Sequence, residues 1–298
     1  MTKGLLNTLK RFYSYQKERF PLVILVISLL PAILSSGAVI SANLTISHIL
    51  ISLLFCVAYL FHIRVIDERR DYDHDTKHHV ERPVQTGLIS NQELKKLDLF
   101  VIAIILITAF VSGIYSTILA VLMLSYSYLA GKEFFLDEKI RKHFFIYNAI
   151  NFVQMLFLQI FIYSVFAGQF LFSNLILSHF LFTLVGSLIF EFVRKLKIPG
   201  HDGTGRDTYT FYLGFKNAII AYFLLASLNT LLFFRVTSLI STHAFIWLIF
   251  SVFSITIISI SAMHHWKKRT KTTDQLLQGN FLLFYALFNI IIYLVKLY

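Results

Sequence analysis

The segment Asp67-Glu68-Arg69-Arg70-Asp71-Tyr72-Asp73-His74-Asp75 places five carboxylates directly behind an apolar run long enough to cross a bilayer. Such a cluster at a membrane face is energetically costly. If the helix of the apolar run continues through the segment, Asp67, Asp71 and Asp75 fall at i, i+4 and i+8 and line one face. Their oxygens could then share Mg²⁺ ions, and those ions could in turn hold a diphosphate.

The composition excludes an ordinary soluble domain. Hydrophobic residues make up 57% of the 298 residues, charged residues only 14%, and the mean hydropathy is +0.70. The formal charge of +11 would suggest nucleic acid as the partner of a soluble protein. Here the basic residues separate apolar runs, so we expect a polytopic protein whose partner is the lipid bilayer and not nucleic acid.

Nine apolar runs are candidate membrane spans, of which the fourth is the weakest because it is short. They are Leu22 to Ile40, Ile46 to Ile63, Leu97 to Tyr115, Thr117 to Ala130, Phe144 to Phe166, Leu175 to Phe192, Ala218 to Phe234, Phe245 to Met263, and Leu276 to Val295. We therefore expect an all-α bundle of nine transmembrane helices that forms a single domain over residues 1–298. Little more than Tyr115-Ser116 separates the third run from the short fourth one, which predicts a tight hairpin.

The distribution of Lys and Arg predicts the orientation. With nine spans, 25 of the 27 basic residues fall on one side, and only Arg235 and Lys296 fall on the other. This bias predicts a cytoplasmic amino terminus in a multi-pass protein, which we expect in the cell (inner) membrane. All sixteen acidic residues also lie on or next to the basic side. Any chemistry should therefore take place at the cytoplasmic face.

The first long loop, from Arg64 to Lys96, combines the acidic segment with Lys77 and the turn-like Arg82-Pro83-Val84-Gln85-Thr86-Gly87. Carboxylates that bind metal, beside Lys and Arg that bind phosphate, suit a diphosphate leaving group. A solvated loop is the simpler alternative, which the four-residue spacing disfavours. A transition-metal site of His74, His78 and His79 is a further alternative, but oxygen ligands dominate and the loop contains no cysteine, so Mg²⁺ is favoured.

A second loop, from Glu191 to Tyr209, repeats the pairing of acid and base. Glu191, Asp202 and Asp207 are the carboxylates, and Arg194 and Lys195 are the adjacent bases. Pro199 and three glycines interrupt the helix there, without the Gly-Lys-Ser/Thr of a phosphate-binding P-loop.

Polar residues between the two loops are further candidates. Tyr128 and Lys132 are spaced i, i+4 on one helix face, where Lys132 could reach a phosphate, although an ordinary positive-inside lysine is the alternative. Asn148 and Asn151 lie in the fifth run and should face the bundle interior. They would either orient a substrate or bond helices to one another. His62 is expected to be a hydrogen-bonded interior residue.

These motifs resemble the UbiA superfamily of intramembrane prenyltransferases over essentially the whole chain. The family motif N-D-x-x-D-x-x-x-D, followed by R-P-x-x-x-G, is matched by Asp67-Glu68-x-x-Asp71-x-x-x-Asp75 and Arg82-Pro83-x-x-x-Gly87. Its Tyr-x-x-x-Lys element falls on Tyr128 and Lys132. Asp67 stands where the family usually has Asn, and Asp202 and Asp207 lie later than a compact second motif would place them.

The resemblance implies a nine-helix fold, Mg²⁺ and diphosphate bound by Glu68, Asp71 and Asp75, and an Arg82 that supports the loop or the phosphate. It also implies prenyl transfer from a polyprenyl diphosphate to a lipophilic or aromatic acceptor. Asp71, Asp75, Lys132 and Glu191 are the catalytic candidates, and either Asp202 or Asp207 completes the second metal set. A transporter or lipid-binding protein and a catalytically altered relative are the alternatives.

Overall fold

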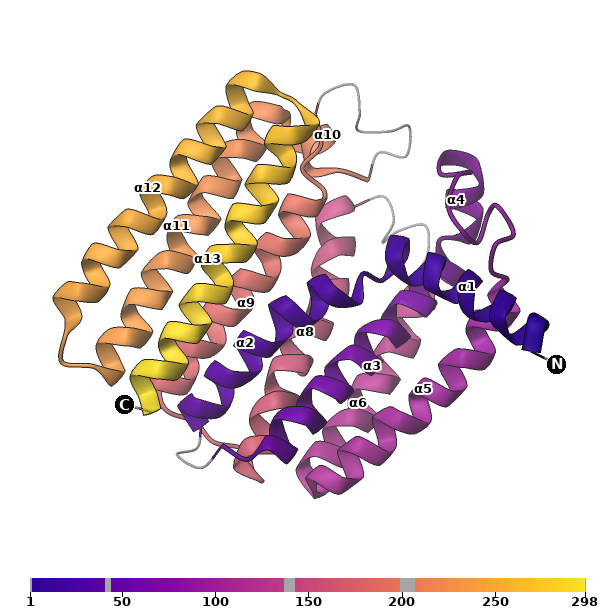
Figure 1. Cartoon of the computed structure of the whole chain (residues 1–298), viewed down its shortest axis with the longest axis horizontal. Coiled ribbons are helices and arrows are strands. Elements are labelled where there is room, and N and C mark those ends of the chain that lie inside the picture. The colour runs from indigo at the N-terminus through magenta and orange to yellow at the C-terminus, as the bar shows by residue number, and fades with distance from the viewer. Residues whose placement is uncertain (1, 41–43, 137–142, 199–206, 298) are drawn as a thin grey trace. The chain divides into compact units, whose positions relative to one another are not determined.

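The computed structural model describes residues 2–40, 44–136, 143–198 and 207–297, which are helical with short connections and contain no strand (Figure 1). This confirms the all-α class. The first-half helices are α1 (Thr2–Arg19), α2 (Leu22–Ile40), α3 (Ile46–Arg70), α4 (Tyr72–His78), α5 (Asn91–Ser112), α6 (Ile114–Gly131) and the short η1 (Glu133–Phe135). They are followed by α8 (Phe144–Ala167), α9 (Asn174–Arg194), α10 (Tyr209–Leu213), α11 (Phe215–Ile240), α12 (Ala244–Lys268) and α13 (Lys271–Leu297).

Eight of the described helices are long and apolar enough to cross a membrane: α2, α3, α6, α8, α9, α11, α12 and α13. They correspond to eight of the nine expected runs. The remaining run forms α5, a helix of 22 residues whose first two turns carry Lys95, Lys96 and Asp98. The chain is therefore a multi-pass membrane protein, and the count of nine spans stays a prediction.

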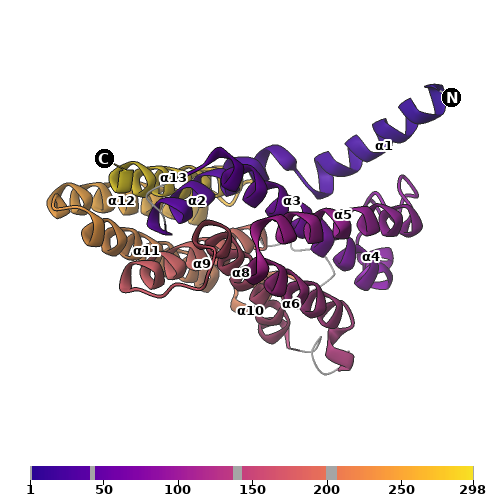
Figure 2. The ribbon, with the colours of Figure 1, turned by 90° about the horizontal axis from the view of Figure 1, so that it is seen from below.

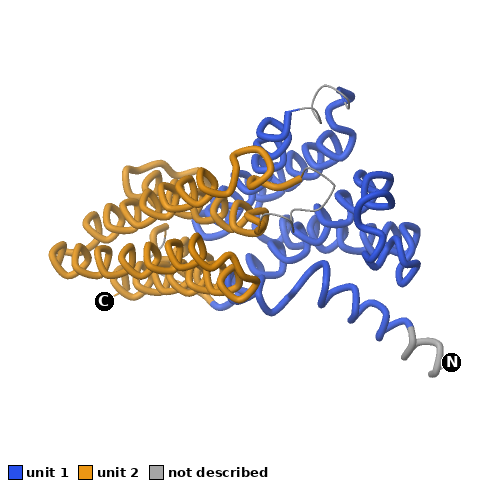
Figure 3. Tube along the Cα trace, turned by 90° about the horizontal axis from the view of Figure 1, so that it is seen from above, with its two compact units in different colours: residues 1–29, 46–168 blue, residues 30–45, 169–298 orange. Residues whose placement is uncertain are grey.

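The helices form two compact units, which Figure 3 colours separately. The first contains residues 1–29 and 46–168, and the second contains residues 30–45 and 169–298. In the first unit α3 packs against α5, and α6 packs against α5 and α8 (Figure 2). In the second unit α11 packs against α9, α12 and α13. The single domain expected from the sequence stays a prediction.

The hairpin between α5 and α6 turns at one residue, Gly113, whose φ is 109°. The turn is tight, as expected, but it lies two residues before Tyr115-Ser116. Glycine adopts a positive φ without a steric penalty, whereas tyrosine and serine do not. The shorter connection lengthens the fourth run into an 18-residue helix.

Buried polar side chains connect helices within each unit. In the first unit His62 on α3 lies 2.7 Å from Asp98 of α5 through Nδ1 and 2.9 Å from Ser127 of α6 through Nε2, which confirms the interior role expected for His62. In the second unit the Ser35 hydroxyl donates to Asn289 at 2.6 Å and lies 2.9 Å from His179. Directional bonds at these depths specify which helix faces meet.

Candidate active site

Helix α3 continues past its apolar run as far as Arg70, bends at Asp71 and resumes as α4. The bend is mild, with φ −93° and ψ 9° at Asp71. The amide of Asp71 donates to the Asp67 carbonyl at 2.9 Å, and the amide of Asp75 donates to the Asp71 carbonyl at 2.8 Å. The i to i+4 bonding therefore runs through the acidic segment, as the carboxylate spacing predicted.

Arg70 bonds to the carboxylates of both Asp67 and Asp71. Its Nη2 donates to Asp67 Oδ1 at 2.7 Å and to Asp71 Oδ2 at 3.2 Å, and its Nε donates to Asp71 Oδ1 at 3.1 Å. The side chain of Arg70 is only 6% exposed, whereas each aspartate side chain is 30% exposed. A buried cation therefore holds two partly accessible carboxylates together.

Helix α8 supplies the other side of this arrangement. Arg70 Nη1 donates to Asn151 Oδ1 at 3.1 Å, and its guanidinium lies 5.0 Å from the ring centre of Tyr147. The Tyr147 hydroxyl donates to Asp71 Oδ1 at 3.3 Å. Asn151 of α8 thus bonds to the acidic segment of α3.

The oxygen atoms around Arg70 suit a magnesium ion. Asp67, Asp71 and Asn151 direct oxygen atoms at one cationic group, and no sulfur or nitrogen ligand takes part in these contacts. Hard oxygen donors of this kind are the ligands that Mg²⁺ prefers. The donor chemistry therefore fits the metal that the sequence motif predicts.

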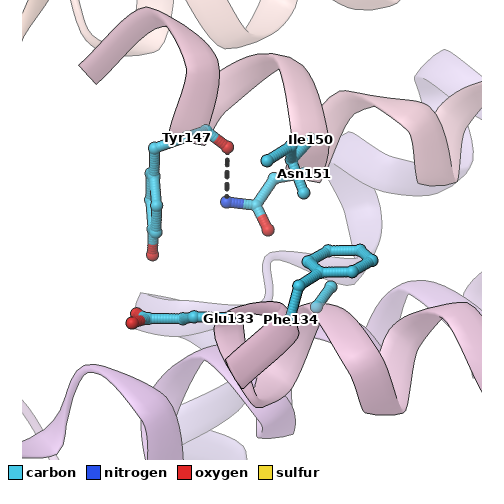
Figure 4. A pocket seen from close by; sticks show the side chains of 6 residues that line it. Glu133, Phe134, Tyr147, Ile150 and Asn151 are labelled. Carbon is cyan, nitrogen blue, oxygen red and sulfur yellow. Dashed lines mark hydrogen bonds between the residues drawn. The ribbon is translucent and has the colours of Figure 1, made fainter. Parts of the chain in front are cut away.

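A small pocket lies beside these residues. It is lined by Ala130, Glu133, Phe134, Tyr147, Ile150 and Asn151. Figure 4 shows Glu133 and Phe134 across from Tyr147 and Asn151. Glu133, Phe134 and Phe135 all have positive φ values, of 48°, 53° and 59°. Three consecutive non-glycine residues in this region are strained, and such strain gathers at functional sites.

Asp75 makes contacts that differ from those of Asp67 and Asp71. Its Oδ2 forms an ion pair with Nη1 of Arg82, and its side chain is 3% exposed. Arg82 begins the predicted turn, in which the Thr86 amide donates to the Arg82 carbonyl at 2.9 Å and Gly87 has a φ of 74°. Arg82 therefore connects this loop to the last carboxylate of the motif.

Glu68 faces a different set of partners. Its Oε1 accepts from Arg19 Nε at 2.7 Å and from Arg64 Nη2 at 2.6 Å, and the side chain is fully buried. The predicted ligand Glu68 is thus paired with two arginines, one of which comes from α1. The structure brings Asp67 and Asp71 together around Arg70 and pairs Glu68 and Asp75 with other arginines.

One face of helix α1 contacts the loop that follows α4. Tyr15 packs in a buried cluster with Val65, Val84, Ile89 and Leu94, and burial raises the pKa of its phenol. Arg11 donates to the Leu88 carbonyl at 2.7 Å and forms an ion pair with Glu93 at 2.9 Å. Arg11, Tyr15 and Arg19 are spaced i, i+4 and i+8, so one face of α1 reaches the loop, the cluster and Glu68.

The other predicted residues of the first unit are mostly exposed. Lys77 is exposed on α4, and Tyr128 and Lys132 are both exposed at the end of α6. Asn148 donates to the Phe144 carbonyl of its own helix at 2.7 Å. Asn151 accepts from Arg70 of the acidic segment at 3.1 Å.

The second acidic segment has local partners. Glu191 accepts from Arg194 Nη2 at 2.8 Å and forms an ion pair with Lys195 Nζ at 2.9 Å. Asp207 is half-buried just before α10, and Asp202 lies outside the described residues. Glu191, Arg194 and Lys195 thus lie within one and a half helical turns at the end of α9.

Tyr209 closes the loop beside Glu191. Its ring stacks on Phe192 with centres 4.3 Å apart, and its amide donates to the Lys195 carbonyl at 3.1 Å. Burial, and then the Glu191 carboxylate, raise the pKa of Tyr209 to about 12. The residue is therefore a neutral phenol at physiological pH.

Sequence reasoning missed Arg70, Glu133, Arg19 and Arg64 as site residues. The i, i+3 spacing of Arg70 from Asp67 was a usable signal, since such pairs share a helix face. Arg64 stands at i−4 to Glu68 and offered the same signal. Arg19 is 49 residues from Glu68, and nothing local indicates the pair. Glu133 depends on a turn whose left-handed conformation no glycine announces.

Comparison with known proteins finds similarity at the level of structure. No protein-family model and no curated protein matches the sequence. A digeranylgeranylglyceryl phosphate synthase structure aligns with 97% of this chain and 99% of its own, at 18% identity and a TM-score of 0.61. The apo structure of a UbiA homologue from Aeropyrum pernix K1 aligns with 89% of this chain and 96% of its own, at 15% identity and a TM-score of 0.65.

A third solved structure carries ligands. It is a UbiA homologue from Archaeoglobus fulgidus bound to GPP and Mg²⁺, which aligns with 93% of this chain and 98% of its own, at 14% identity and a TM-score of 0.59. The alignments cover nearly the full length of both partners. The chain therefore has the fold of the solved UbiA homologues, the superfamily that its motifs resemble.

Proposed function

We propose that the chain transfers a prenyl group from a polyprenyl diphosphate to a lipophilic or aromatic acceptor in the membrane, with Mg²⁺ as cofactor. The observation that carries the proposal is that oxygen atoms of Asp67, Asp71 and Asn151 converge at the end of a membrane-spanning helix. In this structure they bind the guanidinium of Arg70. The fold is that of UbiA homologues, one of which binds GPP and Mg²⁺.

When bound, Mg²⁺ would supply positive charge against the charge that develops on the departing diphosphate. Asp67 and Asp71 hold the metal, and Asn151 orients the bound group. Arg70 keeps the two carboxylates at a fixed separation, so little reorganisation is needed when the diphosphate binds. Glu68 and Asp75 remain proposed members of the metal set.

The reaction breaks the bond between the allylic carbon and the diphosphate oxygen, and the electron pair leaves with the diphosphate. The acceptor nucleophile forms the new bond to that carbon and loses a proton. Tyr147 faces this region from α8, where its ring already lies over a guanidinium. An aromatic face can stabilise the positive charge of the allylic carbon in the same way.

Basic residues would complete the diphosphate site. On the basis of the motif resemblance we propose Arg82 and Lys132 as donors to phosphate oxygens and Tyr128 as a neighbour of the substrate. The mixture of acidic and basic residues in the first loop adds Lys77 as a donor. In the second segment Glu191, with Asp202 or Asp207, would hold a second ion, while Arg194 and Lys195 contact phosphate. We further propose that both segments face the cytoplasm, in line with the charge distribution.

The test is Asp71→Asn in the purified protein, with Asp73→Asn as the matched control. Asp73 is exposed on α4, carries the same charge and lies two residues further along. We expect Asp71→Asn to reduce magnesium-dependent pyrophosphate release by roughly 1,000-fold and Asp73→Asn to leave it unchanged. Mass spectrometry of lipids from cells given candidate prenyl diphosphates would identify the acceptor. Release of pyrophosphate at the parental rate by Asp71→Asn would overturn the metal role of Asp71. Absence of magnesium-dependent pyrophosphate release from the parental protein with every candidate diphosphate would overturn the proposed function and favour a carrier or lipid-binding protein.

A further inference from the structure

Three nitrogen and oxygen ligands meet at the end of α4. His74, Asp75 and His79 each offer a ligand atom, and these atoms all lie within 4.8 Å of one another. His74 Nδ1 is 3.6 Å from Asp75 Oδ1. Two ligands of a tetrahedral zinc ion lie about 3.3 Å apart, given metal–ligand bonds of about 2.0 Å. Small side-chain rotations would therefore bring all three atoms onto one ion.

The backbone at the end of α4 creates this arrangement. His74 and Asp75 are neighbours on the helix, whereas His79 follows the last helical residue and has φ −141° and ψ 51°. Its amide donates to the Asp75 carbonyl at 2.8 Å, which keeps it beside the last turn. Asp75 Oδ2 pairs with Arg82, so it is Oδ1 that faces His74.

We propose that His74, Asp75 and His79 form a transition-metal site, selective for Zn²⁺-class ions and separate from the oxygen ligands around Arg70. Two imidazoles favour such ions over Mg²⁺, which prefers oxygen. Three protein ligands leave positions for water or for a phosphate oxygen. His79 Nδ1 lies 3.8 Å from Glu81, whose carboxylate can orient the ring.

The site takes one histidine from within α4 and one from just beyond its end, and it leaves out His78. The His78 ring lies 4.7 Å from that of His74, but its nitrogen atoms do not belong to the cluster. The side chains of His74 and His79 are 34% and 17% exposed, so an ion can reach them from solvent. His78 is thus a matched control, with the same chemistry on the same short helix.

Asp75 links this ion to the reaction, an extension that rests on the proposed function. The carboxylate of Asp75 cannot serve a zinc ion and a magnesium–diphosphate complex with the same oxygen at once. We expect micromolar Zn²⁺ to inhibit prenyl transfer at saturating Mg²⁺, and this inhibition to be lost in His79→Ala.

The experiment measures metal binding directly and needs no activity. The full-length protein, purified in detergent with a tag that lacks histidine, is titrated with Co²⁺ and followed by its visible absorption, and Zn²⁺ is then added as competitor. We expect one cobalt ion per chain that Zn²⁺ displaces and excess Mg²⁺ does not. His74→Ala and His79→Ala should weaken binding at least 10-fold, and His78→Ala should not.

Equal affinity in the parental protein and in both His74→Ala and His79→Ala would overturn the site, as would displacement of Co²⁺ by Mg²⁺. Loss of binding in His78→Ala alone would also overturn it, because the ligands would then be a different set. Thermal unfolding of each variant, which should match the parental protein without metal, separates a lost ligand from a lost fold. If Co²⁺ binds as expected but no prenyl diphosphate is consumed, the metal site stands and the proposed function fails.

Discussion

The two acidic segments resemble each other in sequence, but their carboxylates are held in different ways. In the first, Glu68 is bound by Arg19 from α1, Asp75 by Arg82 from the following loop, and Arg70 is held by Asn151 from α8. In the second, Glu191 is bound by Arg194 and Lys195, three and four residues further along the same chain segment.

The difference teaches where each geometry comes from. In addition to its local bonds, the first segment has partners that are distant in sequence, such as Arg19 and Asn151, and these reach it only when the first unit has folded. The partners of Glu191 form with a single helix end and are partly exposed, since the side chain of Arg194 is 62% accessible. Substitutions in the first segment should therefore reduce the stability of the fold more than substitutions in the second.

Arg70→Gln should show the largest effect, because it leaves Asp67 and Asp71 close together without a counter-charge. We expect unfolding in detergent to become easier by about 3 kcal/mol. Arg194→Gln should cost less than about 1 kcal/mol, as expected for an exposed pair. Arg69→Gln is the control, since Arg69 is the exposed neighbour. Equal losses from Arg70→Gln and Arg194→Gln would remove the contrast between the segments.

Mg²⁺ should restore part of this loss. If the oxygens around Arg70 bind a divalent cation, the ion should replace the missing positive charge in Arg70→Gln. The variant should then bind Mg²⁺ more tightly than the parental protein does. At about 100 times the dissociation constant the stabilisation is about 2.7 kcal/mol. Thermal unfolding with and without Mg²⁺ measures it, and Asp67→Asn in the Arg70→Gln background should abolish it. An unchanged unfolding temperature on adding Mg²⁺ to Arg70→Gln would argue against the metal set.

Much of this architecture could be predicted from local patterns. The run Leu22 to Ile40 matches α2 at both ends, and the i, i+4 spacing of Asp67 and Asp71 places them on one face, as the structure shows. Hydrophobicity and helical periodicity act over a few residues, so a single sequence displays them.

The remaining features depend on contacts that distant residues make. The pairs Arg19–Glu68 and Arg70–Asn151 span 49 and 81 residues, and nothing in either segment marks its partner. The left-handed turn at Glu133 is also held by its surroundings and not by its own residue types. The short hairpin required Gly113 to be recognised as the turn residue, whereas hydropathy alone favoured the polar Tyr115-Ser116.

Glu68→Gln tests whether this residue supports the fold or binds metal. The buried carboxylate accepts bonds from two arginines, so its neutralisation should reduce stability by about 2 kcal/mol. A supporting residue would leave the magnesium dependence of pyrophosphate release unchanged. A metal ligand would shift that dependence to higher Mg²⁺ concentration, and this outcome would return Glu68 to the set around Asp71.

The smallest effect concerns the ion pair between Arg11 of α1 and Glu93 of α5, and it should depend on pH. Hydrogen bonds from the backbone and the hydroxyl of Ser90, and then the charge of Arg11, lower the pKa of Glu93. A carboxyl group whose pKa is lower in the folded protein stabilises the fold above its unfolded pKa of about 4.3. That contribution is lost as the pH falls through the folded pKa.

Glu93→Gln should therefore reduce stability at pH 7 and have little effect at an acidic pH that lies below the folded pKa, where the parental residue is itself protonated. Unfolding temperatures of the two proteins across this range measure the difference. Glu18→Gln on the exposed side of α1 is the control and should change neither value. A loss of equal size at both pH values would mean that Glu93 acts through packing or neutral hydrogen bonds. The contact between α1 and the loop would then not depend on the charge of Arg11. Ion pairs would contribute less to the stability of the first acidic segment than its contacts indicate.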